Sequence, residues 1–238
     1  MERNARPRGP NHARGSTGSC ELCDGEITRT RAALHYAQCA PAHDVSSGPL
    51  VQLVQLRATS PGLRPYWIDF EAKASARLEA IDALLRRVWL ECCGHLSVFR
   101  IDGVDYFSPG YQLGLAGPFG TDVTERSMKT RVGDALYGGS FEYEYDFGST
   151  TALRLEVTGE RSGRFGRHAV RLLARNSAPV FPCDTCGAPA TLICPYCIQE
   201  GSPAFTCPEH RGEHGCGEEE GFLPVVNSPR MGVCGYVG

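Results

Sequence analysis

The sequence has little lysine and no long apolar run. Only Lys73 and Lys129 are lysines among its 24 basic residues, and 27 acidic residues leave a formal net charge of −3. Its apolar stretches are far shorter than the ~20 residues that span a bilayer, and residues 1–19 lack the apolar core of a signal peptide. No global charge points to a nucleic-acid or membrane partner. We expect a cytoplasmic protein with no membrane partner.

Signatures of catalysis are scarce as well. The chain has no Gly-rich phosphate loop, no Gly-x-Ser-x-Gly elbow and no His-Glu-x2-His helix. One enzymatic feature remains, because Glu142, Glu144 and Asp146 share a strand face and carboxylates so placed can hold Mg²⁺. Arg154 and Arg171 on neighbouring strands can neutralise this row, which would make it a solvated strand face. The sequence therefore favours a non-catalytic protein.

Cysteine, in contrast, is abundant. The 238 residues include 12 Cys and 7 His. A reducing compartment does not hold so many thiols as disulfides, so metal binding is the first hypothesis. We predict Zn²⁺ as the cofactor, at about three ions per chain, a stoichiometry that follows from four ligands per site.

The last sixty residues hold eight potential ligands, enough for two tetrahedral zinc ions. Pairs separated by two residues let both thiolates of a knuckle face one ion. Only seven residues separate the second and third cysteines, which favours interleaved sites over sequential ones. The ligand order resembles the cross-brace fingers of the HIT, MYND and B-box type, which implies a protein-interaction module. In the interleaved arrangement Cys183, Cys186, Cys207 and His210 bind one zinc, and Cys194, Cys197, His214 and Cys216 bind the other.

A third ligand set lies near the N-terminus. Cys20, Cys23, His35 and Cys39 resemble a Cys-Cys-His-Cys variant of the classical zinc finger, and His43 is an alternative to His35 as the fourth donor. Since ~24 residues cannot bury a core, metal would supply the folding free energy of this segment. It is either a structural knob or, through its helix, a nucleic-acid contact. The nucleic-acid hypothesis is supported by nearby cationic side chains, those of Arg3, Arg6, Arg8, Arg14, Arg29 and Arg31.

Three cysteines stay outside these sets. Cys92 completes an apolar helical stripe and is expected to be a small buried hydrophobe. A catalytic pair of Cys93 and His95 is the alternative, although neighbours this close at a helix end rarely meet in nucleophile–base geometry. Cys234 is expected to be a free thiol packed against the C-terminal finger.

The middle of the chain has the periodicities of an α+β domain. Tyr66–Glu71 alternates apolar and polar side chains, which predicts a strand buried on one face, and a helix capped by Ser75 and stopped at Gly94 follows. Asp102-Gly103 predicts a hairpin turn, and residues 108–131 a long loop. Further strands are predicted at Leu50–Leu56, Phe141–Phe147, Thr151–Val157 and Ala169–Arg175. We predict a mixed sheet with one main packed helix, flanked by small zinc-finger modules.

Two runs in this middle segment carry a family resemblance. Tyr66-Trp67-Ile68 through Gly94, and Tyr143-Glu144-Tyr145-Asp146-Phe147-Gly148, resemble the prokaryotic plasmid pRiA4b ORF-3-like family, whose members include passenger proteins of insertion elements. Family members often continue with Asp-x-Trp-x-His, where this chain has Ser149, Thr151 and Leu153. The resemblance implies an α plus β fold and no particular activity.

Four segments follow: an Arg-rich arm at 1–19, a zinc finger at 20–43, the α+β domain at 50–181 and a two-zinc finger with its tail at 182–238. We expect a zinc-binding recognition or adaptor protein that binds a protein partner. The first alternative is a nucleic-acid-binding accessory protein of a mobile element. The second is a metal-dependent hydrolase that uses Glu142, Glu144 and Asp146.

Overall fold

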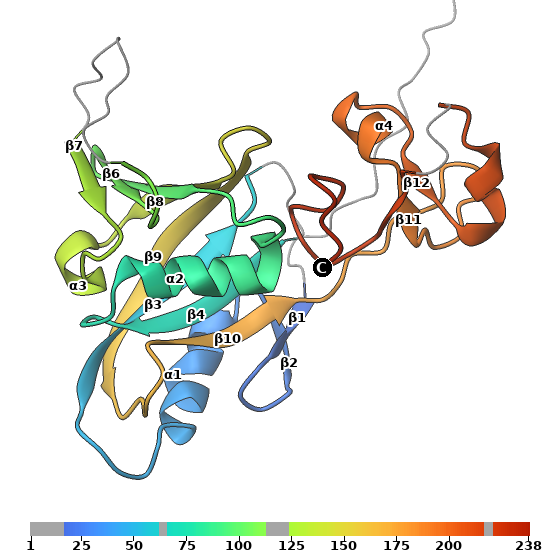
Figure 1. Cartoon of the computed structure of the whole chain (residues 1–238). Helices are drawn as coiled ribbons and strands as arrows, with labels where there is room; N and C mark the ends of the chain where they lie inside the picture. Colours follow the sequence, from blue (N-terminus) through green and yellow to red (C-terminus); the bar gives the residue numbers. More distant parts are fainter. Residues whose placement is uncertain (1–16, 62–65, 113–123, 217–220) are drawn as a thin grey trace, which may run out of the picture.

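The computed structural model describes residues 17–61, 66–112, 124–216 and 221–238. Most of the predicted Arg-rich arm therefore lies outside the described residues. In this part of the chain no helix is both long and apolar enough to cross a membrane. The protein has an α+β fold, with a large mixed sheet and a smaller metal-ligand-rich unit beside it (Figure 1).

The large sheet contains ten strands in the order β2-β1-β10-β4-β3-β9-β8-β5-β6-β7. Neighbouring strands are antiparallel except β6 and β7, which run parallel and make the sheet mixed. Its strands are β1 (Thr17–Cys20), β2 (Glu26–Thr28), β3 (Val51–Thr59), β4 (Trp67–Lys73), β5 (Ser97–Ile101), β6 (Val104–Phe107), β7 (Thr124–Ser127), β8 (Ser140–Tyr145), β9 (Thr151–Gly163) and β10 (Val170–Asn176).

Two helices cover opposite faces of the sheet around β4. Helix α1 (Ala32–Ala42) buries Tyr36 against Trp67, and α2 (Leu78–Leu85) packs on Ile68 and Phe70. Successive strand residues point to opposite faces, so these contacts place the helices on either side. A single π-helical turn, η1 (Arg86–Leu90), extends α2. The short helix α3 (Val132–Ala135) lies between β7 and β8.

The prediction that β4 is buried on one face only is wrong. Asp69 and Glu71, on the polar side of the alternation, are 2% and 0% exposed because α1 and its following loop cover them. Each carboxylate is compensated by arginine: Arg57 donates to Asp69 at 2.7 Å, and Arg161 to Glu71 at 2.8 Å. The alternation predicts solvated polar side chains, whereas Asp69 and Glu71 are buried, paired charges.

Other local predictions had mixed outcomes. The hairpin is confirmed, with Asp102 and Gly103 at φ 49° and 77° as a tight turn requires. Ser75 does not cap α2, whose N-cap is Arg77 with no side-chain cap hydrogen bond. Residues 108–131 are not all loop, because they include β7. The stretch 113–123 lies outside the described residues.

The C-terminal unit has its own three-stranded sheet, in the order β12-β11-β13. These strands are only two residues long, so backbone pairing alone fixes little of the unit. Its elements are β11 (Leu192–Ile193), α4 (Pro195–Gln199), β12 (Phe205–Thr206), the 3₁₀ helix η2 (Pro208–Glu213) and β13 (Leu223–Pro224). We call residues 182–226 the C-terminal module and residues 227–238 the tail.

Candidate metal centres

The structure gathers the cysteines into four groups, each of three cysteines and one histidine. Within each group the ligand atoms all lie within 4.8 Å of one another, and all 12 cysteines are free thiols. Zn–S bonds of about 2.3 Å in a tetrahedron place two sulfurs about 3.8 Å apart. Sulfur pairs in three of the groups are 3.8, 3.8 and 3.7 Å apart, which fits a shared ion and excludes an S–S bond.

The C-terminal module holds two groups in the interleaved arrangement. Cys186 and Cys207 sulfurs are 3.8 Å apart, although 21 residues separate them, while Cys194 and Cys216 sulfurs are 3.7 Å apart. The sequential alternative would need Cys186 beside Cys194 instead. The groups are Cys183, Cys186, Cys207 and His210, and Cys194, Cys197, His214 and Cys216.

Short helical turns orient these ligands. Cys194 is the N-cap of α4 with Cys197 inside it, and Cys207 is the N-cap of η2 with His210 inside it. The Cys207 sulfur lies 3.1 Å from Nδ1 of His210, and the Cys197 sulfur 3.2 Å from Nε2 of His214. Each turn therefore presents two donors, three residues apart, to one ion from a single face.

The knuckle backbone also prepares the thiolates. The amide N–H of Cys186 donates toward the Cys183 sulfur and lowers the pKa of that thiol to about 6. Burial instead raises the pKa of the Cys207 thiol to about 11. A bound cation would offset the cost of ionising the second thiol, as the thiolate is the form that ligates metal.

The N-terminal group is complete with His35. The Cys20 and Cys39 sulfurs are 3.8 Å apart, and Nε2 of His35 lies 3.6 Å from the Cys23 sulfur. Nδ1 of His43, the alternative donor, lies 2.8 Å from the carbonyl oxygen of Cys39 and stays outside the group. Of the two histidines considered, the geometry favours His35.

This N-terminal segment is joined to the main sheet. Strand β1 pairs with β10, and the Tyr36 hydroxyl of α1 donates to Asp69 at 2.9 Å. Gly18 is required here, because a Cβ at this position would lie 2.3 Å from the carbonyl oxygen of Arg175 and 2.7 Å from the Trp67 ring. The segment therefore shares its packing with the sheet as well as holding a ligand group.

The fourth group is absent from the sequence-based prediction. It combines Cys92, Cys93 and His95, which follow η1, with Cys234 from the tail. The prediction that Cys234 packs against the C-terminal finger is wrong, since its sulfur lies 3.3 Å from Nε2 of His95. Adjacent cysteines lack the usual knuckle spacing, and 139 residues separate His95 from Cys234, so no local motif identifies this group.

Two of the three carboxylates at and after β8 are paired with arginine, while Glu142 is exposed. Glu144 forms an ion pair with Arg100, and Asp146 accepts a hydrogen bond of 2.7 Å from Arg230. Arg171, expected opposite this row, instead pairs with Glu71 and Asp44 on the other side of the molecule. Glu142, Glu144 and Asp146 line neither of the two described cavities, so the arrangement gives the hydrolase hypothesis no support.

A cavity of about 430 Å³ opens between the two ligand groups of the C-terminal module. Ligands of both groups reach its wall, which is otherwise mainly polar and carries three carboxylates. The lining includes Asp184, Glu200, Ser202, Phe205, Glu213 and Gly215. A second cavity of about 210 Å³, beside Ser47 and Phe165, lies where β3 begins at Val51 and β4 ends at Lys73.

Comparisons with known proteins identify no family, and the similarity to solved structures is weak. No family model matches the chain, and no curated protein matches it. The crystal structure of a protein of unknown function, MM3350 from Methanosarcina mazei Go1, is similar over 52% of this chain and 67% of that chain, with 15% identity and a TM-score of 0.40.

Proposed function

We propose that the chain is a zinc-binding, non-catalytic recognition protein that binds a protein partner through its zinc-stabilised C-terminal module. Each ligand group supplies four protein donors, which fills a tetrahedral shell. Catalytic zinc sites keep one position for water or substrate, whereas structural sites are closed. Three thiolates and an imidazole also suit zinc better than the hard cations that oxygen ligands hold. Zinc bound to these groups would therefore have a structural role and stabilise the fold of the module.

The cavity of the C-terminal module supports the choice of partner. It lies between the two ligand groups, so ions bound there would fix its walls. Its lining includes the exposed Glu200 and Glu213 and the partly exposed Phe205. A cavity lined by three carboxylates and one aromatic ring suits a protein segment that carries lysine or arginine side chains.

Charge distribution argues against nucleic acid as the main partner. Phosphate binding requires cationic side chains that are available at the surface. Helix α1, the candidate recognition helix, contains no Arg or Lys. Several buried or half-buried guanidiniums are already paired with carboxylates inside the protein, including those of Arg57, Arg86, Arg161, Arg171 and Arg230.

The remaining aspects of the function are proposals of the same kind. Twelve free thiols favour a reducing compartment, the cytoplasm. Membership in the pRiA4b ORF-3-like family, and a place in a mobile element, rest on the resemblance of the two runs Tyr66–Gly94 and Tyr143–Gly148.

The test is selection of peptides by the full zinc-loaded chain. A random peptide library is panned against the protein, and the selected peptides are measured by fluorescence anisotropy. The variant Ser202→Arg fills the acidic cavity with a cation, whereas Ser47→Arg makes the same change at the smaller cavity. We expect selected peptides rich in Lys and Arg that lose at least tenfold in affinity with Ser202→Arg and keep it with Ser47→Arg.

Two results would contradict the proposal. One is a selection without enrichment, or peptides that bind both variants equally well. The other is tight, salt-sensitive binding of a DNA or RNA oligonucleotide in the same assay, which would establish the nucleic-acid alternative.

A further inference from the structure

The fourth ligand group has the composition and geometry of the other three. It consists of three cysteines and one histidine, and its four donor atoms lie within 4.8 Å of one another. Nε2 of His95 is 3.3 Å from the Cys234 sulfur, comparable with the His–Cys distances of 3.1 and 3.2 Å in the C-terminal module. With this group included, every cysteine of the chain belongs to a four-donor set.

The surroundings of these donors are built to support a metal. Nδ1 of His95, the nitrogen that faces away from Cys234, lies 3.6 Å from the Asp146 carboxylate. A carboxylate behind a ligating histidine fixes the ring orientation and raises its basicity. On the other side, Nε of Arg230 donates to the Cys92 sulfur at 3.3 Å. The Asp146 backbone and the Cys234 backbone both take left-handed conformations here, with φ of 65° and 50°.

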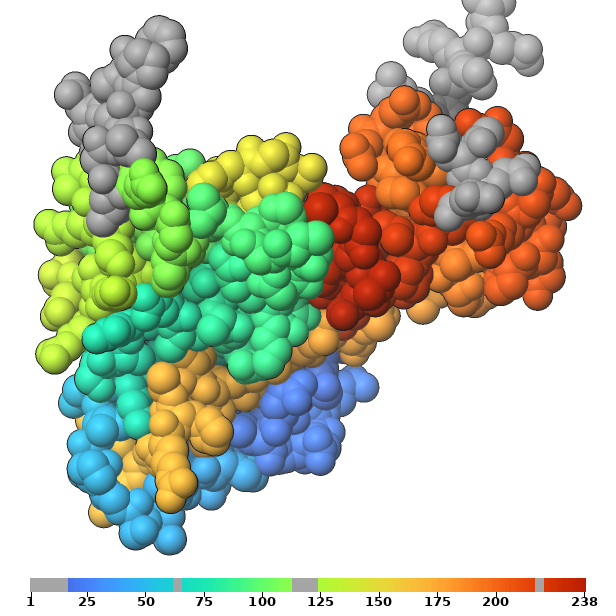
Figure 2. Space-filling model, in the orientation of Figure 1, coloured from blue at the N-terminus to red at the C-terminus, as the bar shows by residue number. Residues whose placement is uncertain are grey.

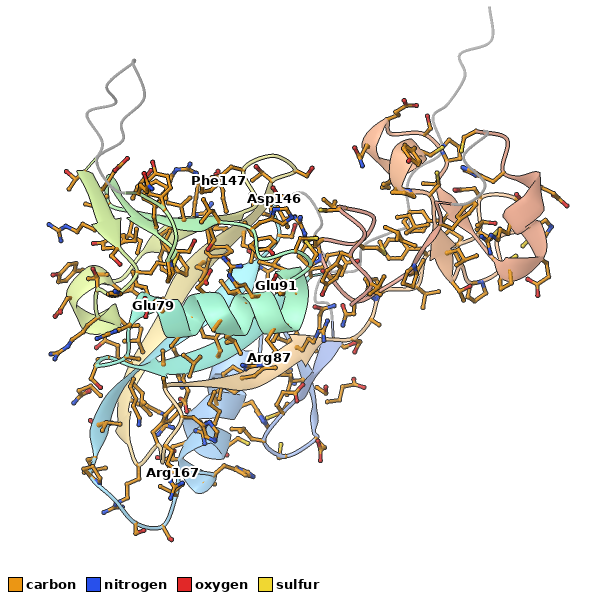
Figure 3. The ribbon with its side chains drawn as sticks, viewed as in Figure 1. Glu79, Arg87, Glu91, Asp146, Phe147 and Arg167 are labelled. Carbon is orange, nitrogen blue, oxygen red and sulfur yellow. The ribbon has the colours of Figure 1, made fainter. Side chains whose placement is uncertain are left out.

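Arg230 links these two features. Its side chain is fully buried and donates to Asp146 at 2.7 Å and to the Thr151 hydroxyl at 3.0 Å. A cation beside a sulfur ligand stabilises the thiolate. Three thiolates around a divalent ion carry a net charge of −1, which this guanidinium faces. Figure 3 shows Asp146 and Glu91 together at the end of α2 and η1 that meets the tail.

The tail that supplies Cys234 lies between the two parts of the molecule. The Ser228 hydroxyl donates to the carbonyl oxygen of Trp89 at 2.6 Å, on the central side. Met231 belongs to the apolar cluster of the C-terminal module, together with Ile193. In Figure 2 the tail, in red, fills the space between the segment around α2 and the C-terminal module.

We propose that Cys92, Cys93, His95 and Cys234 form a fourth zinc site, which clasps the tail to the central sheet and thereby fixes the C-terminal module against it. The ion acts as a cross-link between residues 139 positions apart. This role goes beyond the recognition function, because it does not depend on which partner the acidic cavity accepts.

The experiment counts metal and maps the thiols of the full chain. Protein purified without added metal is analysed by elemental mass spectrometry as wild type, Cys93→Ser and Val237→Ala. The last is the matched control, since Val237 lies in the same tail, 63% exposed and outside the group. We expect four zinc ions per chain in the wild type and in Val237→Ala, and three in Cys93→Ser. Amide exchange of the tail should rise in Cys93→Ser alone.

Thiol mapping keeps the test valid if Cys93→Ser does not fold. Cys93 and Cys234 are exposed, so as free thiols they would react with iodoacetamide at once. We expect both to stay unmodified in the wild type until a chelator is added. Reaction of Cys92, Cys93 and Cys234 before chelation while the other nine cysteines stay protected would overturn the proposal. A disulfide among the three, or three zinc ions in every variant, would overturn it too.

Discussion

The large sheet and the C-terminal module are stabilised in different ways. The sheet and the helices packed on it bury an apolar core that includes Trp89, Tyr143 and Phe99, all fully buried. The main cluster of the module has five buried members, of which Cys194 and Cys197 also belong to a candidate metal-ligand group and Met231 comes from the tail. A unit of this size does not bury enough apolar surface to fold alone. The sheet therefore depends on side-chain packing, whereas under the proposed function the module depends on bound ions.

Chelation should separate the two parts, and this is the largest effect we expect. Because metal affinity supplies the folding free energy of small metal-held units, excess chelator should unfold the module around residues 183–216. Hydrogen–deuterium exchange should then lose protection in α4 and η2 and keep it in β3 and β9. Equal loss of exchange protection in both parts, or loss in neither, would contradict the claim that only the module depends on metal.

The junction between the parts should be nearly as sensitive. Arg230→Met leaves the buried Asp146 carboxylate without its cation, and breaking a buried ion pair costs about 3–5 kcal/mol. We expect a lower free energy of unfolding in urea and faster exchange of the tail amides. Arg87→Met, an exposed change on η1, should stay within about 0.5 kcal/mol of wild type. A similar loss in both variants would mean that the ion pair is unimportant.

A cavity in the sheet core should weaken that part alone. Leu85 is fully buried against the sheet, and Leu85→Ala should cost roughly 3 kcal/mol through lost packing and the remaining void. Leu34→Ala, at a side chain 77% exposed, is the control. Zinc content should be the same in both variants. Loss of zinc with Leu85→Ala would show that the metal groups depend on the apolar core.

The smallest effect concerns the ion-pair network between α1 and the sheet. Hydrogen bonds from Arg161 lower the pKa of Asp44 below its ordinary value of 3.8. A lowered pKa stabilises the fold above the unfolded-state pKa, and this contribution disappears as the pH falls through the folded-state pKa. Asp44→Asn should therefore cost about 1–2 kcal/mol at pH 7, and the difference should shrink as the pH falls below 3.8 through the lowered folded-state pKa. Urea unfolding at a series of pH values measures this, and a pH-independent difference would contradict it.

Local patterns predicted what depends on local chemistry. The hairpin follows from Asp102-Gly103, and the knuckle spacings led to three ligand groups that the structure brings together. The interleaved arrangement followed from the short gap between Cys186 and Cys194.

Contacts between residues far apart in the sequence could not be predicted from local patterns. Asp69 and Glu71 have the pattern of solvated strand residues, yet α1 covers them, and sequence alternation carries no record of which element packs on a face. The fourth group likewise depends on the tail returning to η1. A count of unassigned cysteines was the available signal, since Cys92, Cys93 and Cys234 remained with His95 nearby.

The most direct test of the account is the metal content of the full chain, purified without added metal, by elemental mass spectrometry with thiol titration before and after chelation. The account predicts four zinc ions per chain and 12 thiols that become reactive only after chelation. Iron in place of zinc, or a metal-free protein with reactive thiols or disulfides, would contradict the claim that these cysteines are ligands of structural zinc.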